Sequence, residues 1–115
     1  MKILSIFTLD STTAQPPSQP NIERMEAFIA ELRSKGALID TGGVMDGLLE
    51  LQVTRKGADY TVTDGPFTES KEIVGGYALL EVADREEAID LTQRFLDIVG
   101  DAKCHLHQVS SPDLE

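Results

Sequence analysis

Apolar and polar residues alternate along this chain with two different periods, and each period predicts one kind of element. A period of two residues, which is typical of strands, occurs five times. The predicted strands are residues 2–9, residues 37–40 with a continuation over 47–54 beyond Gly42 and Gly43, residues 60–63, residues 77–82 and residues 103–109. A period of three to four residues predicts helices over residues 20–35 and 85–99.

Cap residues at the helix ends support these boundaries. Gly36 follows the first helix, where a glycine commonly ends a helix. Asp84 precedes the second helix with Glu87 three residues later, which is the spacing of a capping box, and Gly100 follows its last apolar residue. The resulting order, β-α-β-β-β-α-β, predicts a ferredoxin-like α+β fold, an antiparallel sheet with two helices on one face.

Two of the predicted strands are apolar on both of their faces. In the first strand, Ile3 and Phe7 alternate with Leu4 and Ile6, and the later strand "YALLEV" follows the same pattern. Two helices can cover only one face of a sheet, and a face left open to water should alternate to polar residues. A second copy packed sheet against sheet would bury the other face, so we predict a homodimer.

Length and charge narrow the class of protein. The 115 residues predict a single domain over residues 1–110, followed by a tail at residues 111–115. The formal net charge of −10 repels phosphate backbones and anionic lipids, so direct binding to nucleic acid or membranes is not expected. No apolar run approaches a membrane span or a signal-peptide core, and the lone Cys104 forms no intramolecular disulfide, so the expected location is cytoplasmic.

The segment from Thr63 to Tyr77, "TDGPFTESKEIVGGY", interrupts the strand pattern. Asp64 before Gly65 favours a tight turn, and Pro66 has no N–H with which to continue a central ladder. Two interpretations stay open. Asp64 and Lys71 could bind a substrate at the rim of a cleft, with Lys71 contacting an anionic group and Asp64 acting as a base. Alternatively, Asp64 could cap its own turn while the other charged residues are solvated.

Tyr77 and Cys104 also have two interpretations each. Tyr77 follows two glycines at the start of a strand, where it could contact a ligand or pack against a partner. Cys104 could act as a nucleophile, but it stands beside Leu106 on the side predicted to face the helices. There a cysteine usually behaves as a small buried apolar residue.

His105 and His107 are the two histidines of the chain, two positions apart on the last predicted strand. Both rings therefore point to the same face, opposite Cys104 and Leu106. The pair could transfer protons near neutral pH, and we name both as candidate catalytic residues. The alternative is hydrogen bonding at the dimer interface. No third ligand accompanies them and no cofactor motif occurs, so neither a metal nor a cofactor is predicted.

The stretch "TVTDGPFTESKEIVGGYALLEV", followed by "ADREEAIDLTQRF", resembles the DGPF branch of the YCII-related family. This resemblance implies a ferredoxin-like fold and a dimeric α+β barrel. It also implies an intracellular bacterial protein, in a family sometimes encoded beside or fused to extracytoplasmic-function sigma factors. Some YCII-related proteins are similar to small-molecule lyases with a His–Asp pair as acid and base. Their histidine lies in or near the first helix, where this chain has none, so that mechanism does not carry over.

Two hypotheses about function follow. In the first, the chain binds a small molecule in a cleft between the helices, the sheet and the Asp64–Glu72 loop, and it could act there as a cofactor-free lyase-type enzyme with His105 or His107 as base. In the second, it is a non-catalytic module, for example a partner of a sigma factor, for which an acidic surface would suit a basic protein.

Overall fold

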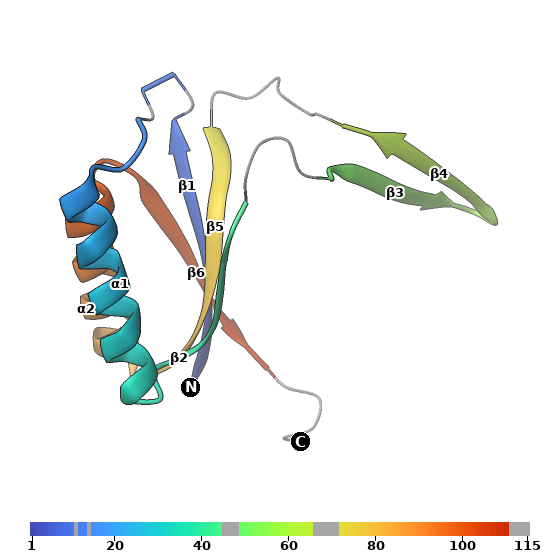
Figure 1. Ribbon diagram of the computed structural model, residues 1–115. Helices are drawn as coiled ribbons and strands as arrows, with labels where there is room; N and C mark the ends of the chain where they lie inside the picture. Colours follow the sequence, from blue (N-terminus) through green and yellow to red (C-terminus); the bar gives the residue numbers. More distant parts are fainter. Residues whose placement is uncertain (11, 14, 45–48, 66–71, 111–115) are drawn as a thin grey trace.

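The computed structural model describes residues 1–10, 12–13, 15–44, 49–65 and 72–110 (Figure 1). Its elements are β1 (Lys2–Asp10), α1 (Gln19–Ser34), β2 (Leu38–Gly43), β3 (Leu51–Lys56), β4 (Asp59–Asp64), β5 (Glu72–Glu81), α2 (Arg85–Val99) and β6 (Lys103–Val109). The predicted tail, residues 111–115, lies outside the described residues.

Four strands form the main sheet, in the order β2-β5-β1-β6, and every neighbouring pair is antiparallel. This is the strand order of a ferredoxin-like fold, so the predicted α+β class is confirmed. Both helices lie on one side of the sheet (Figure 1). The remaining strands, β3 and β4, pair only with each other in a second, two-stranded sheet.

The structure differs from the predicted pattern between β2 and β3, where one interrupted strand was expected and two separate strands are found. Gly42 and Gly43 lie within β2 and do not end it. A Cβ on Gly42 would lie 2.8 Å from Cε1 of Tyr77, so the glycine makes room for that ring, while Gly43 pairs with Gly76 of β5. The glycines therefore mark a close approach between strands.

The helix ends follow the sequence signals. The Ser18 side chain caps α1 by accepting a hydrogen bond from the backbone N–H of Asn21 at 3.3 Å. Asp84 caps α2 by accepting one from the N–H of Glu87 at 2.9 Å, and Gly100 ends that helix with φ at 92°. The predicted caps of the second helix are confirmed.

The hydrophobic core fills the space between the helices and one face of the sheet. Its buried members are Ile3, Phe28, Leu32, Ala37, Leu38, Leu80, Val82, Ala88, Leu91 and Ile98. Phe7 of β1 extends this packing by an edge-to-face contact with Phe95 of α2, with ring centroids 5.2 Å apart. The same face of the sheet carries Leu106 of β6, which packs against the core as predicted.

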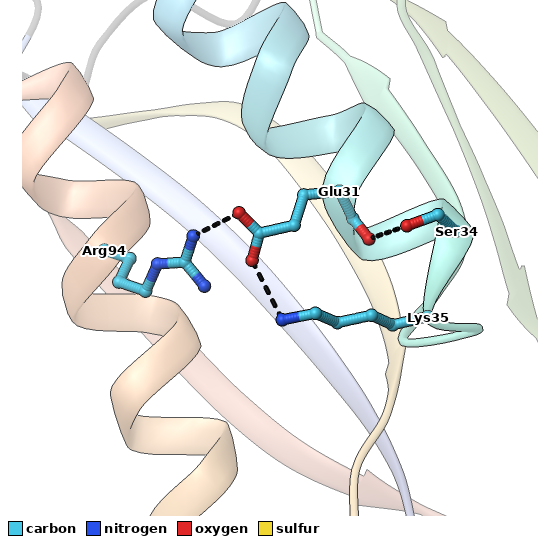
Figure 2. Close-up of polar contacts among 4 residues, drawn as sticks. All are labelled: Glu31, Ser34, Lys35 and Arg94. Atoms are coloured by element: carbon cyan, nitrogen blue, oxygen red, sulfur yellow. Dashed lines mark hydrogen bonds and ion pairs between the residues drawn. The ribbon is translucent and has the colours of Figure 1, made fainter.

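The two helices are also joined by a polar contact (Figure 2). A carboxylate oxygen of Glu31 in α1 accepts a hydrogen bond from the Arg94 guanidinium of α2 at 2.7 Å, and its other oxygen accepts one from Lys35 at 3.0 Å. Arg94 also lies over the ring of Phe28, 4.8 Å from its centroid. Arg94 therefore fixes α2 against α1 through both its charge and its planar face.

The other face of the main sheet is apolar but carries no helix. The strand register places Leu4 beside Leu79 and Ile6 beside Tyr77 on this face, which we call the open face. Leu4, Ile6 and Leu79 are half-buried, while 39% of Tyr77 is exposed. In the part of the chain that the structure describes, no element packs over these side chains, so the predicted apolar second face is present.

Candidate functional site

A cleft of about 930 Å³ lies where the end of β1 and the beginning of β5 meet the start of α1 and the end of α2. Its apolar walls come from β1, α1 and α2: Phe7, Leu9, Ile22, Met25, Ile98 and Val99. The loop between β1 and α1 closes one side with Pro16 and Pro17. Because the walls belong to regular elements, the cleft is formed by the fold itself.

Three carboxylates stand among the residues that line the cleft: Asp10, Glu26 and Asp101. No lysine, arginine or histidine stands among the described lining residues. Thr12 donates two hydrogen bonds to the Asp10 carboxylate, from its Oγ1 at 2.6 Å and its backbone N at 2.8 Å. These bonds hold the pKa of Asp10 below its ordinary value, so this carboxylate stays ionised at neutral pH.

A glycine makes room for the apolar side chains that line the cleft. Gly75 lies at the irregularity in β5 where the register with β1 shifts after Phe7. A Cβ at this position would lie 2.6 Å from both Cδ2 of Leu9 and Cε1 of Phe7. The absence of a side chain therefore lets Phe7 and Leu9 pack over the strand and form the apolar floor of the cleft.

A smaller hollow of about 520 Å³ adjoins the cleft and shares Leu9, Asp10 and Asp101 with it. Its basic group is Lys103, whose Nζ lies 2.6 Å from Oε1 of Glu72. This bond holds the pKa of Glu72 below its ordinary value. The positive charge of Lys103 in β6 is thus directed across β1 at a carboxylate of β5.

His105 and His107 lie on the open face, away from the cleft. Their strand pairs them with Ile6 and Leu4 of β1, and their ring centroids are 6.4 Å apart. Both residues are exposed, and neither lines the cleft or the hollow. The predicted shared direction of the two rings is observed, but their proposed catalytic role stays a prediction.

Cys104 points to the other side of β6, as predicted. It is half-buried, it pairs with Phe7 of β1, and burial raises the pKa of its thiol while a hydrogen bond with Ser5 opposes that shift. A thiol with a raised pKa carries little thiolate at neutral pH, which disfavours a role as nucleophile.

Tyr77 also lies on the open face, and its ring covers Gly42. Its hydroxyl donates a hydrogen bond to Oδ2 of Asp40 at 2.9 Å, and this bond to a carboxylate raises the pKa of Tyr77. The hydroxyl is therefore held as a donor to Asp40. Tyr77 was predicted from the sequence, but Asp40, its partner on the neighbouring strand, was not.

The other two predicted binding residues are not brought into the cleft by the described structure. Asp64 is the last residue of β4 and pairs with Leu51 of β3, and it is not among the residues that line the cleft. Lys71 lies outside the described residues, as does most of the loop to which it belongs. Their proposed roles in binding stay predictions.

The carboxylates of the cleft were not predicted from the sequence, although the pairing of the first and last strands places two of them, Asp10 and Asp101. Thr8 of β1 pairs with Lys103 of β6, so Asp10 and Asp101 stand at the same end of the sheet. That register follows from the predicted antiparallel pairing of the first and last strands. Glu26 reaches the site from α1, and its position depends on how the helix crosses the sheet.

The described part of the chain contains neither a metal-binding cluster nor a membrane-spanning helix. There, no group of three or more His, Cys, Asp or Glu side chains is arranged to hold a metal ion. None of the described helices is both long enough and apolar enough to cross a membrane.

Comparison with solved structures gives a neighbour of the same fold. It is the 5-chloro-2-hydroxyhydroquinone dehydrochlorinase of Burkholderia phenoliruptrix AC1100, solved in complex with 2,5-dihydroxybenzoquinone. The two chains are 17% identical, with a TM-score of 0.55, over 99% of this chain and 98% of the dehydrochlorinase. No curated protein matches this chain.

The family is shown by the sequence itself. The model of the YCII-related domain matches residues 1–95, which is most of the chain. The resemblance carried by the "TDGPFTESKEIVGGY" stretch is thereby confirmed. This chain belongs to the YCII-related family.

Proposed function

We propose that this protein binds a small molecule in the cleft between α1, α2 and the ends of β1 and β5. The observation that supports this proposal is the cleft of about 930 Å³, with apolar walls and a few polar groups at its rim. Binding sites for small molecules generally have this size and composition. The structural neighbour, which was solved with a small quinone, has the same fold and so is compatible with this proposal.

The charges of the cleft favour a particular class of ligand. Asp10, Glu26 and Asp101 line it, and the described lining residues include no basic group. Carboxylates repel an anion and attract a cation, and these interactions are strengthened where apolar walls exclude water. We therefore expect an apolar ligand with an amino group or neutral hydrogen-bond donors.

The cleft also has the means for proton transfer, as a cofactor-free lyase requires. Elimination begins when a base removes a proton, and a carboxylate within hydrogen-bond reach of the substrate can serve. Glu26 and Asp101 stand at the cleft, whereas the hydrogen bonds from Thr12 make Asp10 a weaker base. His105 and His107 could act only on a molecule held at the open face, since they point away from this cleft.

A ligand panel tests the site and its charge preference together. Matched aromatic amines, alcohols and carboxylates of equal size would be titrated against the protein by calorimetry. We expect the amines to bind about tenfold more tightly than the carboxylates, and Glu26→Gln or Asp101→Asn to reduce that ratio. The matched control is His105→Ala, which should leave binding unchanged. Binding that depends on His105 would move the site to the open face, and no binding of any class would contradict the proposal.

We further propose that the protein is a homodimer joined at the open face. Leu4, Ile6 and Leu79 form a continuous apolar strip there, and the described structure covers it with no other element. Exposed apolar patches of this kind commonly mark interfaces, and an isologous pair buries both copies of the strip at once. Light scattering should give twice 12.6 kDa, and Leu79→Glu should shift the mass towards the monomer. A monomer mass for the unaltered chain at tens of micromolar would contradict this assembly.

The alternative of a regulatory module for a sigma factor receives no support from the family match or from the structural neighbour. We therefore prefer the small-molecule hypothesis.

A further inference from the structure

The hairpin of β3 and β4 has one apolar and one polar face. Val53 stands opposite Val62, and Arg55 stands opposite Tyr60. Leu51 stands opposite Asp64 on the same face, so the apolar residues of this face share it with one charged residue near each end. The residues of the other face are all polar: Gln52, Thr54, Lys56, Asp59, Thr61 and Thr63. Residues of this hairpin therefore alternate as they do in a sheet that packs on one side and meets water on the other.

The apolar face of the hairpin meets no other part of the described chain. Leu51, Val53, Tyr60 and Val62 are 43%, 60%, 68% and 61% exposed. The guanidinium of Arg55 over the Tyr60 ring, 5.7 Å from its centroid, is a contact within the hairpin. A hairpin of two strands alone is at best marginally stable in water, so a group of exposed apolar side chains on one of its faces implies a surface against which it packs.

The position of the hairpin indicates where that surface lies. Figure 1 shows β3 and β4 extending away from the main sheet on the side opposite the two helices. The chain consequently measures 45 × 42 × 19 Å, and its radius of gyration of 16.4 Å exceeds the roughly 13 Å expected for a compact domain of this length. The hairpin and the open face thus border the same side of the molecule.

We propose that the apolar face of the β3–β4 hairpin packs against a second copy of this chain, as an arm that holds the copy seated on the open face. This inference rests on the proposed homodimer and adds the surface that would complete its interface. A second copy on that side would cover both the open face and the apolar face of the hairpin. Two-fold symmetry would cover the same two surfaces of the second copy.

The charge of the hairpin favours a copy of the same chain as the occupant. The chain carries a net charge of −10, so two copies repel each other over most of their surfaces. Within residues 51–64, however, Arg55 and Lys56 balance Asp59 and Asp64. This arm is neutral within an acidic molecule, which lets it approach an acidic partner without repulsion.

The two faces of the hairpin provide a matched test. Val62→Glu places a charge on the apolar face, whereas Thr61→Glu places the same charge on the polar face one residue away. Sedimentation at a series of concentrations would give the dimer dissociation constant of each variant. We expect Val62→Glu to raise it at least about tenfold and Thr61→Glu to change it by less than about threefold. Val53→Glu, on the opposing strand, should repeat the effect of Val62→Glu.

The outcomes separate this inference from the homodimer itself. If Leu79→Glu dissociates the dimer while Val62→Glu does not, the homodimer stands and the role of the arm is overturned. Equal effects of Val62→Glu and Thr61→Glu would also overturn it, because the apolar face would then have no special part. A monomeric unaltered chain would overturn both proposals. Circular dichroism of each hairpin variant checks that the main sheet and helices are retained, which we expect because Val53, Thr61 and Val62 are exposed.

Discussion

The two faces of the main sheet are made by alternate residues of the same strands, yet they have different surroundings. Leu80 faces the helices and is 5% exposed, whereas its neighbour Leu79 faces the open side and is only half-buried. Both are leucines in one strand, so residue type alone does not distinguish them. The comparison teaches that apolar residues on a second face identify a surface that this chain does not cover by itself.

The largest expected effect comes from truncating a buried side chain on the face of the sheet that the helices cover. Leu80→Ala should lower the free energy of unfolding by about 2–5 kcal/mol, because it leaves a cavity in a closed core. Leu79→Ala should cost about 1 kcal/mol or less where the protein is monomeric, because that side chain stays partly in contact with water. Urea unfolding at low protein concentration measures both variants. Equal losses would show that the two faces are covered alike.

The next effect is the protection of Cys104, whose side chain points to the covered face, whereas the next residue, His105, belongs to the open face. Burial raises the pKa of this thiol, so little thiolate is present at neutral pH. A disulfide reagent should therefore react with the folded protein about tenfold more slowly than with the protein in urea. The control is a His105→Cys variant in a Cys104→Ala background, studied at a protein concentration low enough for the monomer, since that thiol then faces water. Similar rates in the two proteins would contradict the assignment of faces.

A smaller effect tests the ion pair between Glu31 and Arg94, which joins the two helices. Hydrogen bonds from Arg94 and then Lys35 lower the pKa of Glu31 from 4.5 to about 2. A carboxylate with a depressed pKa stabilises the fold above the unfolded-state pKa, and this contribution is lost as the pH falls from about 4.5 towards 2. Arg94→Met should lower the melting temperature at pH 6 by about 2–4 °C, and the difference should shrink across that window.

Arg85→Met is the matched control for this substitution. Arg85 also forms an ion pair, with Glu86, but the two side chains are 78% and 76% exposed. Exposed pairs contribute little, so the melting temperature of Arg85→Met should stay unchanged. A fall in melting temperature for Arg94→Met that persists undiminished at pH 2 would assign the effect to the contact with Phe28, not to Glu31.

The smallest effect concerns the open face. The hydrogen bond to Asp40 raises the pKa of Tyr77, so Asp40→Ala should lower that pKa towards its ordinary value near 10. The ultraviolet absorbance of tyrosinate follows this titration, and a Tyr60→Phe background leaves Tyr77 as the single tyrosine. An unchanged titration curve would mean that Tyr77 and Asp40 do not interact in solution.

The sequence predicted the main sheet and its helices because their signals are local. Asp84, Glu87 and Gly100 mark the ends of α2, and strict alternation along β6 assigned His105 and Cys104 to opposite faces. A cleft was predicted beside the Asp64–Glu72 loop, but the carboxylates that line the observed cleft were not, because Glu26 and Asp101 are brought together only by the packing of α1 over the end of the sheet. The separate hairpin was missed for another reason: Gly42 and Gly43 resemble a strand interruption, although they serve the close contact with Tyr77 and Gly76.

The way in which the hairpin joins the sheet has a consequence for how chains of this kind can change. Gly43, the last residue of β2, pairs with Gly76 of β5, so the chain leaves the main sheet and returns to it at neighbouring positions. The arm is therefore an insertion into a hairpin of the four-stranded body. Its length can vary, or a short turn can replace it, while the register of the sheet and the packing of both helices stay the same. Evolution and protein engineering can thus alter the arm and the cleft independently.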